Sequence, residues 1–225
     1  MRLVSLQVGQ PQTIPETGSS EWWDKSWTSA FYKAPVSGDV WLGYEGLDGD
    51  GQADRRYHGG VDKAVCTYSE EHYPYWRETL HLADFPYGAF GENFTVTGLT
   101  ETEVFLGDVY SVGEALVEIS QPRQPCWKPA RHWRIKDLTA QIEHTGKTGF
   151  YFRVMRHGNV RAGQEFILVS RHWPQWSIAR CNEVMYDLRE DADAALSLSD
   201  CPALAGSWKD ALFARYRSLA DRTAS

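Results

Sequence analysis

Short apolar runs, separated by glycine, proline and polar turns, follow one another closely through the first three quarters of the chain. Residues 3–8 alternate apolar and polar side chains, as a strand with one buried face does. Similar runs recur at residues 40–42, 63–68 and 90–96, and few stretches have the length and period of a helix. Many short strands at close spacing are typical of antiparallel barrels. The sequence therefore predicts a mostly β, barrel-like fold with a few short helices.

Two turn sequences favour hairpins within this pattern. Gly113-Glu114 lies in the middle of residues 108–120, and His157-Gly158-Asn159 lies between the runs at residues 150–155 and 164–169. A turn of this composition between two apolar runs favours antiparallel pairing of the runs. We also expect a short helix over residues 133–143.

The pattern changes after residue 169. Ile178, Cys181 and Met185 recur at helical spacing, and the amphipathic repeat continues toward the C-terminus. We therefore expect two parts, a barrel domain over residues 1–170 and a small helical extension over residues 171–225.

Charge and cysteine usage exclude several classes of protein. The formal net charge of −7 argues against a general nucleic-acid binder, which is usually basic. No apolar run is long enough to span a bilayer, and the N-terminus has no apolar signal-like segment. The four cysteines form no C-x-x-C pair, so a zinc ribbon or a thioredoxin-like motif is excluded. We expect a cytoplasmic protein that binds neither nucleic acid nor membranes.

One cysteine stands in an unusual frame. Cys126 follows Pro122 and Pro125, which restrict the backbone before it and favour an extended loop. Arg123 and Lys128 are close in sequence, and a positive neighbourhood favours the thiolate, which is the form that binds metals or attacks electrophiles. A buried structural cysteine is the alternative.

A second segment combines cations with two adjacent glycines. Backbone amides beside glycine form anion-binding nests, and flanking cations add to phosphate recognition. The candidate residues of this segment are Arg55, Arg56, His58, Gly59, Gly60 and Lys63. The alternatives are a solvated charge run for the two arginines and a structural role for the histidine.

Six blocks, in this order, resemble MOSC-domain proteins, which are named after the C-terminal domain of molybdenum cofactor sulfurase. The blocks are residues 29–36 (SAFYKAPV), 46–54 (GLDGDGQAD), 58–65 (HGGVDKAV), 90–94 (FGENF), 107–108 (GD) and 121–126 (QPRQPC). The bacterial YiiM-like branch is the most similar. The resemblance covers residues 3–169 for the barrel, and the tail resembles the three-helix extension of that branch.

The resemblance implies an antiparallel MOSC barrel that binds molybdenum cofactor (molybdopterin), with Cys126 as the metal ligand. It also implies an oxidoreductase, since relatives reduce N-hydroxylated compounds such as hydroxylaminopurine bases to amines. On this basis Cys126, His58 and Lys33 are the expected catalytic residues, with His58 as proton donor because imidazole titrates near neutral pH. The expected cofactor-binding residues are Lys33, Arg55, Arg56, His58, Gly59, Gly60, Lys63, Asn93, Gln121 and Arg123. Arg153 is added to them from its place in a strand pattern alone. The family is further associated with pyridoxal phosphate.

The remaining expectations concern partners and alternatives. The sequence has no iron–sulfur cysteine set, haem motif or Rossmann fingerprint, which implies a separate electron-donor protein. A monomer or homodimer is expected. Trp127 departs from the smaller or tyrosine-like residues expected at its position, and we expect it to narrow the substrate pocket. Two other functions stay open: a non-catalytic carrier of molybdenum cofactor or of a Cys126 persulfide, and a regulatory protein.

Overall fold

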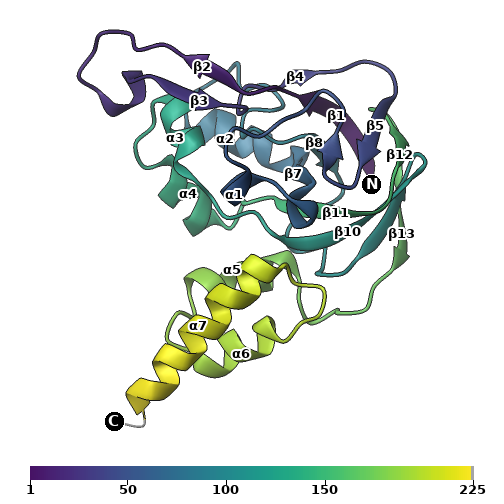
Figure 1. Cartoon of the computed structure of the whole chain (residues 1–225), viewed down its shortest axis with the longest axis vertical. Coiled ribbons are helices and arrows are strands. Elements are labelled where there is room, and N and C mark those ends of the chain that lie inside the picture. The colour runs from purple at the N-terminus through teal and green to yellow at the C-terminus, as the bar shows by residue number, and fades with distance from the viewer. Residues whose placement is uncertain (224–225) are drawn as a thin grey trace.

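The computed structural model describes residues 1–223, and its main feature is a curled eight-stranded sheet (Figure 1). The strands, in their order across the sheet, are β13 (Phe166–Ser170), β9 (Val109–Val112), β10 (Ala115–Pro122), β11 (Phe150–Arg156), β7 (Val65–Ser69), β8 (Phe94–Thr97), β1 (Arg2–Val8) and β4 (Ala34–Pro35). Neighbouring strands are antiparallel except β7 and β8, which are parallel. The sheet is therefore mixed rather than purely antiparallel.

The sheet curls until β1 meets the segment that leads into β13. Leu3 N donates to the carbonyl of Gln164 at 2.9 Å, and Gly163 N donates to the carbonyl of Leu3 at 2.7 Å. Phe166 N donates to the carbonyl of Met1 at 3.1 Å. Because these bonds join strands from the two ends of the sheet, they confirm the barrel-like fold.

One predicted hairpin is right and the other is wrong. β9 and β10 pair across Gly113-Glu114 as expected. The chain after β11 instead forms β12 (Gly158–Val160), which pairs with β5 (Val40–Gly43), and β13 pairs with β9. A turn sequence shows where the chain reverses, but it does not show which strand the next segment pairs with, since that depends on distant residues. β5 also pairs with β6 (Gly46–Leu47).

Seven helices, all short except the last, lie within residues 1–223. They are α1 (Arg55–His58), α2 (Tyr73–Thr79), α3 (Trp127–Trp133), α4 (Leu138–Thr145), α5 (Ile178–Tyr186), α6 (Ala192–Ser199) and α7 (Gly206–Thr223). The helix predicted over residues 133–143 is present as α4, but its predicted start is wrong, because α3 ends at Trp133 and α4 begins five residues later. Arg134, with φ 56°, has the left-handed conformation that ends α3. Glycine usually occupies such a position, so this break could not be predicted from the residue at position 134.

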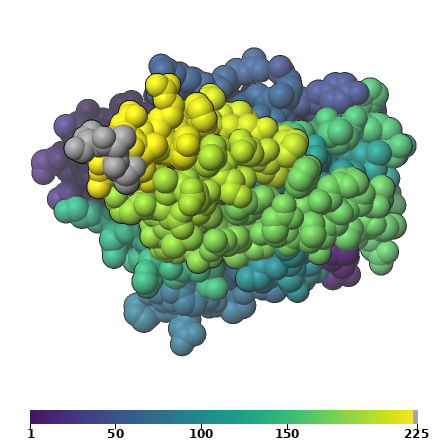
Figure 2. Space-filling model, turned by 90° about the horizontal axis from the view of Figure 1, so that it is seen from below, coloured from purple at the N-terminus to yellow at the C-terminus, as the bar shows by residue number. Residues whose placement is uncertain are grey.

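One hydrophobic core fills the barrel and continues into the C-terminal helices. Val117 and Phe152 of the sheet belong to the same cluster of buried side chains as Cys181, Leu198 and Trp208. Figure 2 shows α5–α7, in light green to yellow, covering this face of the molecule. The three helices confirm the predicted helical extension, and the barrel and the helices share their packing.

A second core lies between β7 and the helices α2, α3 and α4. Tyr68 of β7 stacks on Phe90 with ring centroids 4.3 Å apart, and Trp76 of α2 donates its indole N–H to the Tyr68 hydroxyl at 2.6 Å. All five residues of β7 are buried, since Val65 belongs to the first core and Tyr68 to the second. Cys66 is therefore held on a strand that is packed on both faces. In the part of the chain described, no helix is long and apolar enough to cross a membrane.

Candidate active site

A cavity of about 70 Å³ lies where loops from distant parts of the chain meet. Its walls come from residues 30–33, 50–53, 58, 63–66, 90–93, 123–128 and 151. Of the residues predicted from the sequence, those among residues 1–223 that line it are Lys33, His58, Lys63, Asn93, Arg123 and Cys126. We call this cavity the inner chamber.

A wider cavity of about 390 Å³ adjoins the inner chamber. The two share five lining residues, which are His58, Lys63, Cys126, Lys128 and Tyr151. The wider cavity also has Tyr57 and Trp127 in its wall, and both side chains are exposed to solvent. We call it the outer chamber. Cys126 therefore lies at the boundary between the two chambers and lines both.

Cys126 is presented as the two prolines predict. Its backbone is extended, with φ −123° and ψ 169°, and α3 begins at the next residue. Arg123 N donates to the carbonyl of Gly149 at 2.9 Å, and the Thr139 hydroxyl donates to the Cys126 carbonyl at 3.1 Å. The thiol is half-buried. The loop is thus fixed on both sides of the sulfur while the sulfur stays accessible from the chambers.

Lys33 is held by a carboxylate that sequence reasoning missed. Its ammonium group forms an ion pair with Asp50, and both side chains are almost completely buried, at 6% and 2% exposure. Asp50 also accepts a hydrogen bond from Gly9 N at 2.8 Å. The segment around Asp50 is turn-rich and acidic, which was the available signal. The ion pair fixes Lys33 beside the inner chamber.

Arg123 is buried and carries an unused donor. Its Nη2 donates to the carbonyl of Phe90 at 2.5 Å, whereas its Nη1 has no hydrogen-bond partner among the described residues. Burial by itself would lower the pKa of this guanidinium, but Cys66, Tyr151 and Cys126 nearby raise it overall. A buried cationic donor without a partner is costly unless another group accepts from it. An anion in the inner chamber would satisfy it.

His58 differs from its sequence-based expectation. Burial, together with the positive charges of Lys128, Arg123 and Lys63, lowers its pKa from 6.5 to about 4. The imidazole is therefore neutral at pH 7 in the protein without a bound anion. The expectation that it titrates near neutrality was wrong for this state, because the imidazole is largely buried and three cations lie near it.

Lys63 and Lys128 complete the positive lining. Lys63 Nζ donates to the carbonyl of Tyr57 at 2.9 Å, and burial lowers its pKa. Burial also lowers the pKa of Lys128, which the sequence placed beside Cys126 but which was not among the predicted site residues. Among residues 1–223, four cations but only one carboxylate, Asp50, line the inner chamber. Its electrostatics therefore favour an anionic ligand.

Several predicted residues lie outside both chambers. Arg55 pairs with Glu45 at 2.5 Å on the surface. Arg153 pairs with Asp62 at 2.9 Å and with Glu118 at 3.4 Å. Arg56, Gly59 and Gly60 are also absent from the lining of either chamber in the described part of the chain.

Two predicted polar residues have structural partners. Asn93 accepts from Cys66 N and donates to the carbonyl of Gln7, each at 3.2 Å. Gln121, which lines the outer chamber, donates to the carbonyl of Pro122 at 3.1 Å. Both amides therefore help to hold the loops that form the walls.

Sequence reasoning also missed Cys66 and Tyr151. Both are buried, and both line the inner chamber. Burial raises the pKa of the Cys66 thiol and raises that of the Tyr151 phenol well above 10.0, so both groups stay protonated near pH 7. Each lies on a strand and carries no local motif, so only its position in the fold identifies it.

An aromatic arm supports the mouth of the outer chamber. β2 (Gln12–Ile14) pairs with β3 (Trp27–Ser29) to form the arm, which projects beside α3 in Figure 1. The rings of Trp27 and Trp127 lie 5.4 Å apart, and the Arg131 guanidinium lies 4.8 Å from the Trp27 centroid. These contacts hold Trp127 at the mouth while leaving almost half of it exposed.

Comparison with protein families gives two matches along the chain. The MOSC domain model matches residues 54–166, and the model described as YiiM-like, 3-alpha helix domain matches residues 176–215. The first region includes most of the residues that line the two chambers, and the second covers α5, α6 and the first half of α7.

Individual relatives agree with these matches. The chain is similar to protein YflK of Bacillus subtilis, with 42% identity over 92% of this chain and 90% of YflK. It is similar to the crystal structure of YiiM from Geobacillus stearothermophilus, with 40% identity, a TM-score of 0.79, and coverage of 96% and 98% of the two chains. It is also similar to a fungal protein named reductase, from Gibberella moniliformis, at 35% identity over 70% of this chain and 28% of that protein.

Proposed function

The chain belongs to the MOSC-domain proteins with a YiiM-like three-helix domain, and from this premise we propose that it is a molybdenum-cofactor-dependent reductase of N-hydroxylated compounds. The observation that carries the proposal is the inner chamber, where the half-buried Cys126 thiol shares a wall with four cations. The fungal relative's name supports reductase chemistry for that protein.

The donor set fits a sulfur-bound metal on an anionic cofactor. A thiolate is a soft ligand of the kind that such metals prefer, so Cys126 would hold the metal. The unpartnered Nη1 of Arg123 would donate to an anionic oxygen of the cofactor. Lys63 and Lys128 would supply further charge. Arg55, Arg56 and Arg153 have no part in this proposal, since they lie outside the chambers.

When bound, the cofactor would supply the electron pair that removes the hydroxyl oxygen from the substrate. Reduction of R–NHOH to R–NH₂ and water also consumes two protons, which protein groups must hold or pass on. We assign one to His58, because an anion in the chamber would offset the three cations that, together with burial, lower the pKa of the imidazole. Lys33, which is fixed by Asp50 and lines the inner chamber, would hold the substrate oxygen or a water molecule.

The outer chamber would receive the substrate. Tyr57 and Trp127 in its wall present exposed rings, which suit flat heteroaromatic compounds. Electrons would come from a separate protein. The match to the fungal reductase occupies 28% of that protein, so most of the fungal chain lies outside the matched region.

The test uses protein made in a host with abundant molybdenum cofactor. Wild type should contain molybdenum by elemental analysis and should reduce a hydroxylaminopurine base with an artificial electron donor. Cys126→Ala should lose both, whereas Cys201→Ala, which removes a buried thiol outside the chambers, should keep both.

Each other outcome has a definite meaning. Equal, near-zero molybdenum in wild type and Cys126→Ala would contradict cofactor binding. Bound cofactor that is released to an acceptor protein without any turnover would contradict the reductase and support the carrier.

A further inference from the structure

A third cavity, of about 420 Å³, shares no lining residue with the two chambers. It lies between the loop at residues 100–102, the C-terminal end of α4 with the segment that follows it, and one face of α5. It therefore lies at the junction of the barrel and the helical extension. We call it the junction groove.

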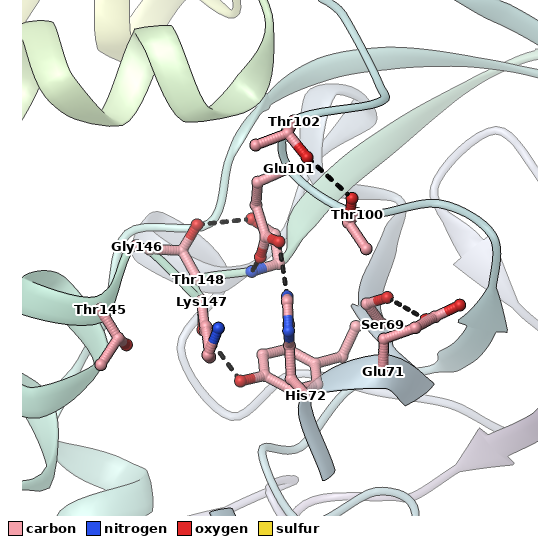
Figure 3. A network of polar contacts seen from close by, with 12 residues as sticks. Ser69, Glu71, His72, Thr100, Glu101, Thr102, Thr145, Gly146, Lys147 and Thr148 are labelled. Atoms are coloured by element: carbon pink, nitrogen blue, oxygen red, sulfur yellow. Dashed lines mark hydrogen bonds and ion pairs between the residues drawn. The ribbon is translucent and has the colours of Figure 1, made fainter. Parts of the chain in front are cut away.

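A buried hydrogen bond between a histidine and a carboxylate forms the floor of the junction groove. His72 Nε2 lies 2.6 Å from Glu101 Oε2, and the two residues are only 7% and 4% exposed. Glu101 Oε1 accepts from Gly149 N at 2.7 Å. Figure 3 shows His72 and Glu101 pointing toward each other, with Gly146 and Thr148 beside them. Both oxygens of this carboxylate are thus used, and the floor is fixed.

Two polar groups of α5 in the groove wall have unused hydrogen-bonding capacity. Asn182 is 4% exposed, and its Nδ2 donates to the Thr148 hydroxyl at 2.8 Å. Its Oδ1 and the hydroxyl of Tyr186 are buried and have no partner among residues 1–223. The two residues are four positions apart and so lie on one face of the helix. Buried polar atoms without partners are rare in native proteins and indicate a missing partner.

The charges around the groove indicate what that partner is. The carboxylates of Glu143 and Asp187 line it, together with Glu183, which pairs with Arg180 at 2.6 Å. One lysine, Lys147, also lines the groove, and its ammonium group lies 5.1 Å from the centroid of the Tyr75 ring. Burial raises the pKa of the Tyr186 phenol, the negative charge of Glu143 raises it further, and the positive charge of Arg189 opposes this rise. Acceptors and negative charge therefore dominate beside α5, which favours a ligand that donates and is positive.

A metal ion does not fit this arrangement. No group of three or more His, Cys, Asp or Glu side chains within residues 1–223 could hold one. The unpartnered atoms are an amide oxygen and a phenol, which suit N–H donors. We propose that the junction groove binds a small organic cation with several N–H donors, of the alkyl diamine or alkyl guanidine class, with Glu143, Asn182 and Tyr186 as its contacts.

Agmatine, which carries an ammonium and a guanidinium group, is the probe, and binding is measured by isothermal titration calorimetry. Wild type should bind it with a Kd of about 1 mM or below. Glu143→Gln should weaken binding about tenfold, and Tyr186→Phe should weaken it several-fold. The matched controls Glu78→Gln and Tyr216→Phe, which change residues outside the groove, should bind like wild type.

A folding defect is distinguished by thermal unfolding without ligand. Tyr186→Phe removes a hydroxyl that has no partner, so its midpoint should equal or exceed that of wild type. Absence of agmatine binding by wild type at about 10 mM would overturn the proposal. Equal affinity of wild type and Glu143→Gln would also overturn it, as would binding of 1,4-butanediol as tight as that of agmatine.

Discussion

Replacing His58 by glutamine should reduce the amount by which the free energy of unfolding falls on acidification. In the folded protein without a bound anion, burial and the neighbouring cations lower the pKa of His58 from 6.5 to about 4. In the unfolded chain the imidazole regains its ordinary value. A difference of this size corresponds to about 3 kcal/mol of free energy between the two protonation states.

The sign follows from which state takes up the proton first. As the pH falls below 6.5, the unfolded chain protonates His58 while the folded protein does not. The free energy of unfolding therefore falls between pH 6.5 and about 4, and the loss from this residue is complete below that window and absent above it. At about pH 4.5 the expected loss is about 2.5 kcal/mol.

The assay is urea unfolding of wild type and His58→Gln at about pH 7 and about pH 4.5, with His144→Gln as the control at an exposed histidine. Wild type and the control should lose about 2.5 kcal/mol more than His58→Gln on acidification. NMR titration of the His58 ring gives the pKa directly, and saturating phosphate should raise it. A pKa above about 6 without phosphate, or equal acid losses in all three proteins, would refute the electrostatic account of the inner chamber.

Three further predictions concern the charged residues around the chambers. Asp50→Asn leaves the buried Lys33 ammonium without its partner, so urea unfolding should show a loss of about 3–5 kcal/mol; a loss below about 1 kcal/mol would contradict the buried pair. Arg153→Met should leave molybdenum content and turnover unchanged and should lower stability by about 1 kcal/mol, whereas lost turnover would return this residue to the site. Arg123→Met should abolish the rise in thermal midpoint that phosphate produces in wild type, and an unchanged rise would show that Nη1 does not bind the anion.

The sequence predicted where the strands lie better than it predicted which strands pair. Alternating apolar runs identified β1, β5 and β7, and the turn at Gly113-Glu114 identified a hairpin, because these signals are local. The partner of β13 and the break at Arg134 were not predictable, since one depends on distant strands and the other on a left-handed residue that is not glycine.

The site shows the same division between local and long-range information. Two prolines and nearby cations pointed to Cys126, and the structure places it beside Lys33 and His58 from distant segments. Arg153 resembled a ligand-binding cation because its partners, Asp62 and Glu118, are far away in sequence. Tyr151 could not be predicted from the sequence, since it belongs to no local motif and lines the inner chamber only because of where β11 lies in the fold.

The barrel and the three C-terminal helices were matched by separate family models, yet their buried side chains form one continuous cluster. Trp208 of α7 and Phe152 of the sheet exclude water from the same interior. A barrel expressed alone would expose to solvent the apolar surface that α5–α7 cover, and it should therefore aggregate. Because one cluster of buried side chains serves both regions, we expect the barrel and the three helices to unfold together.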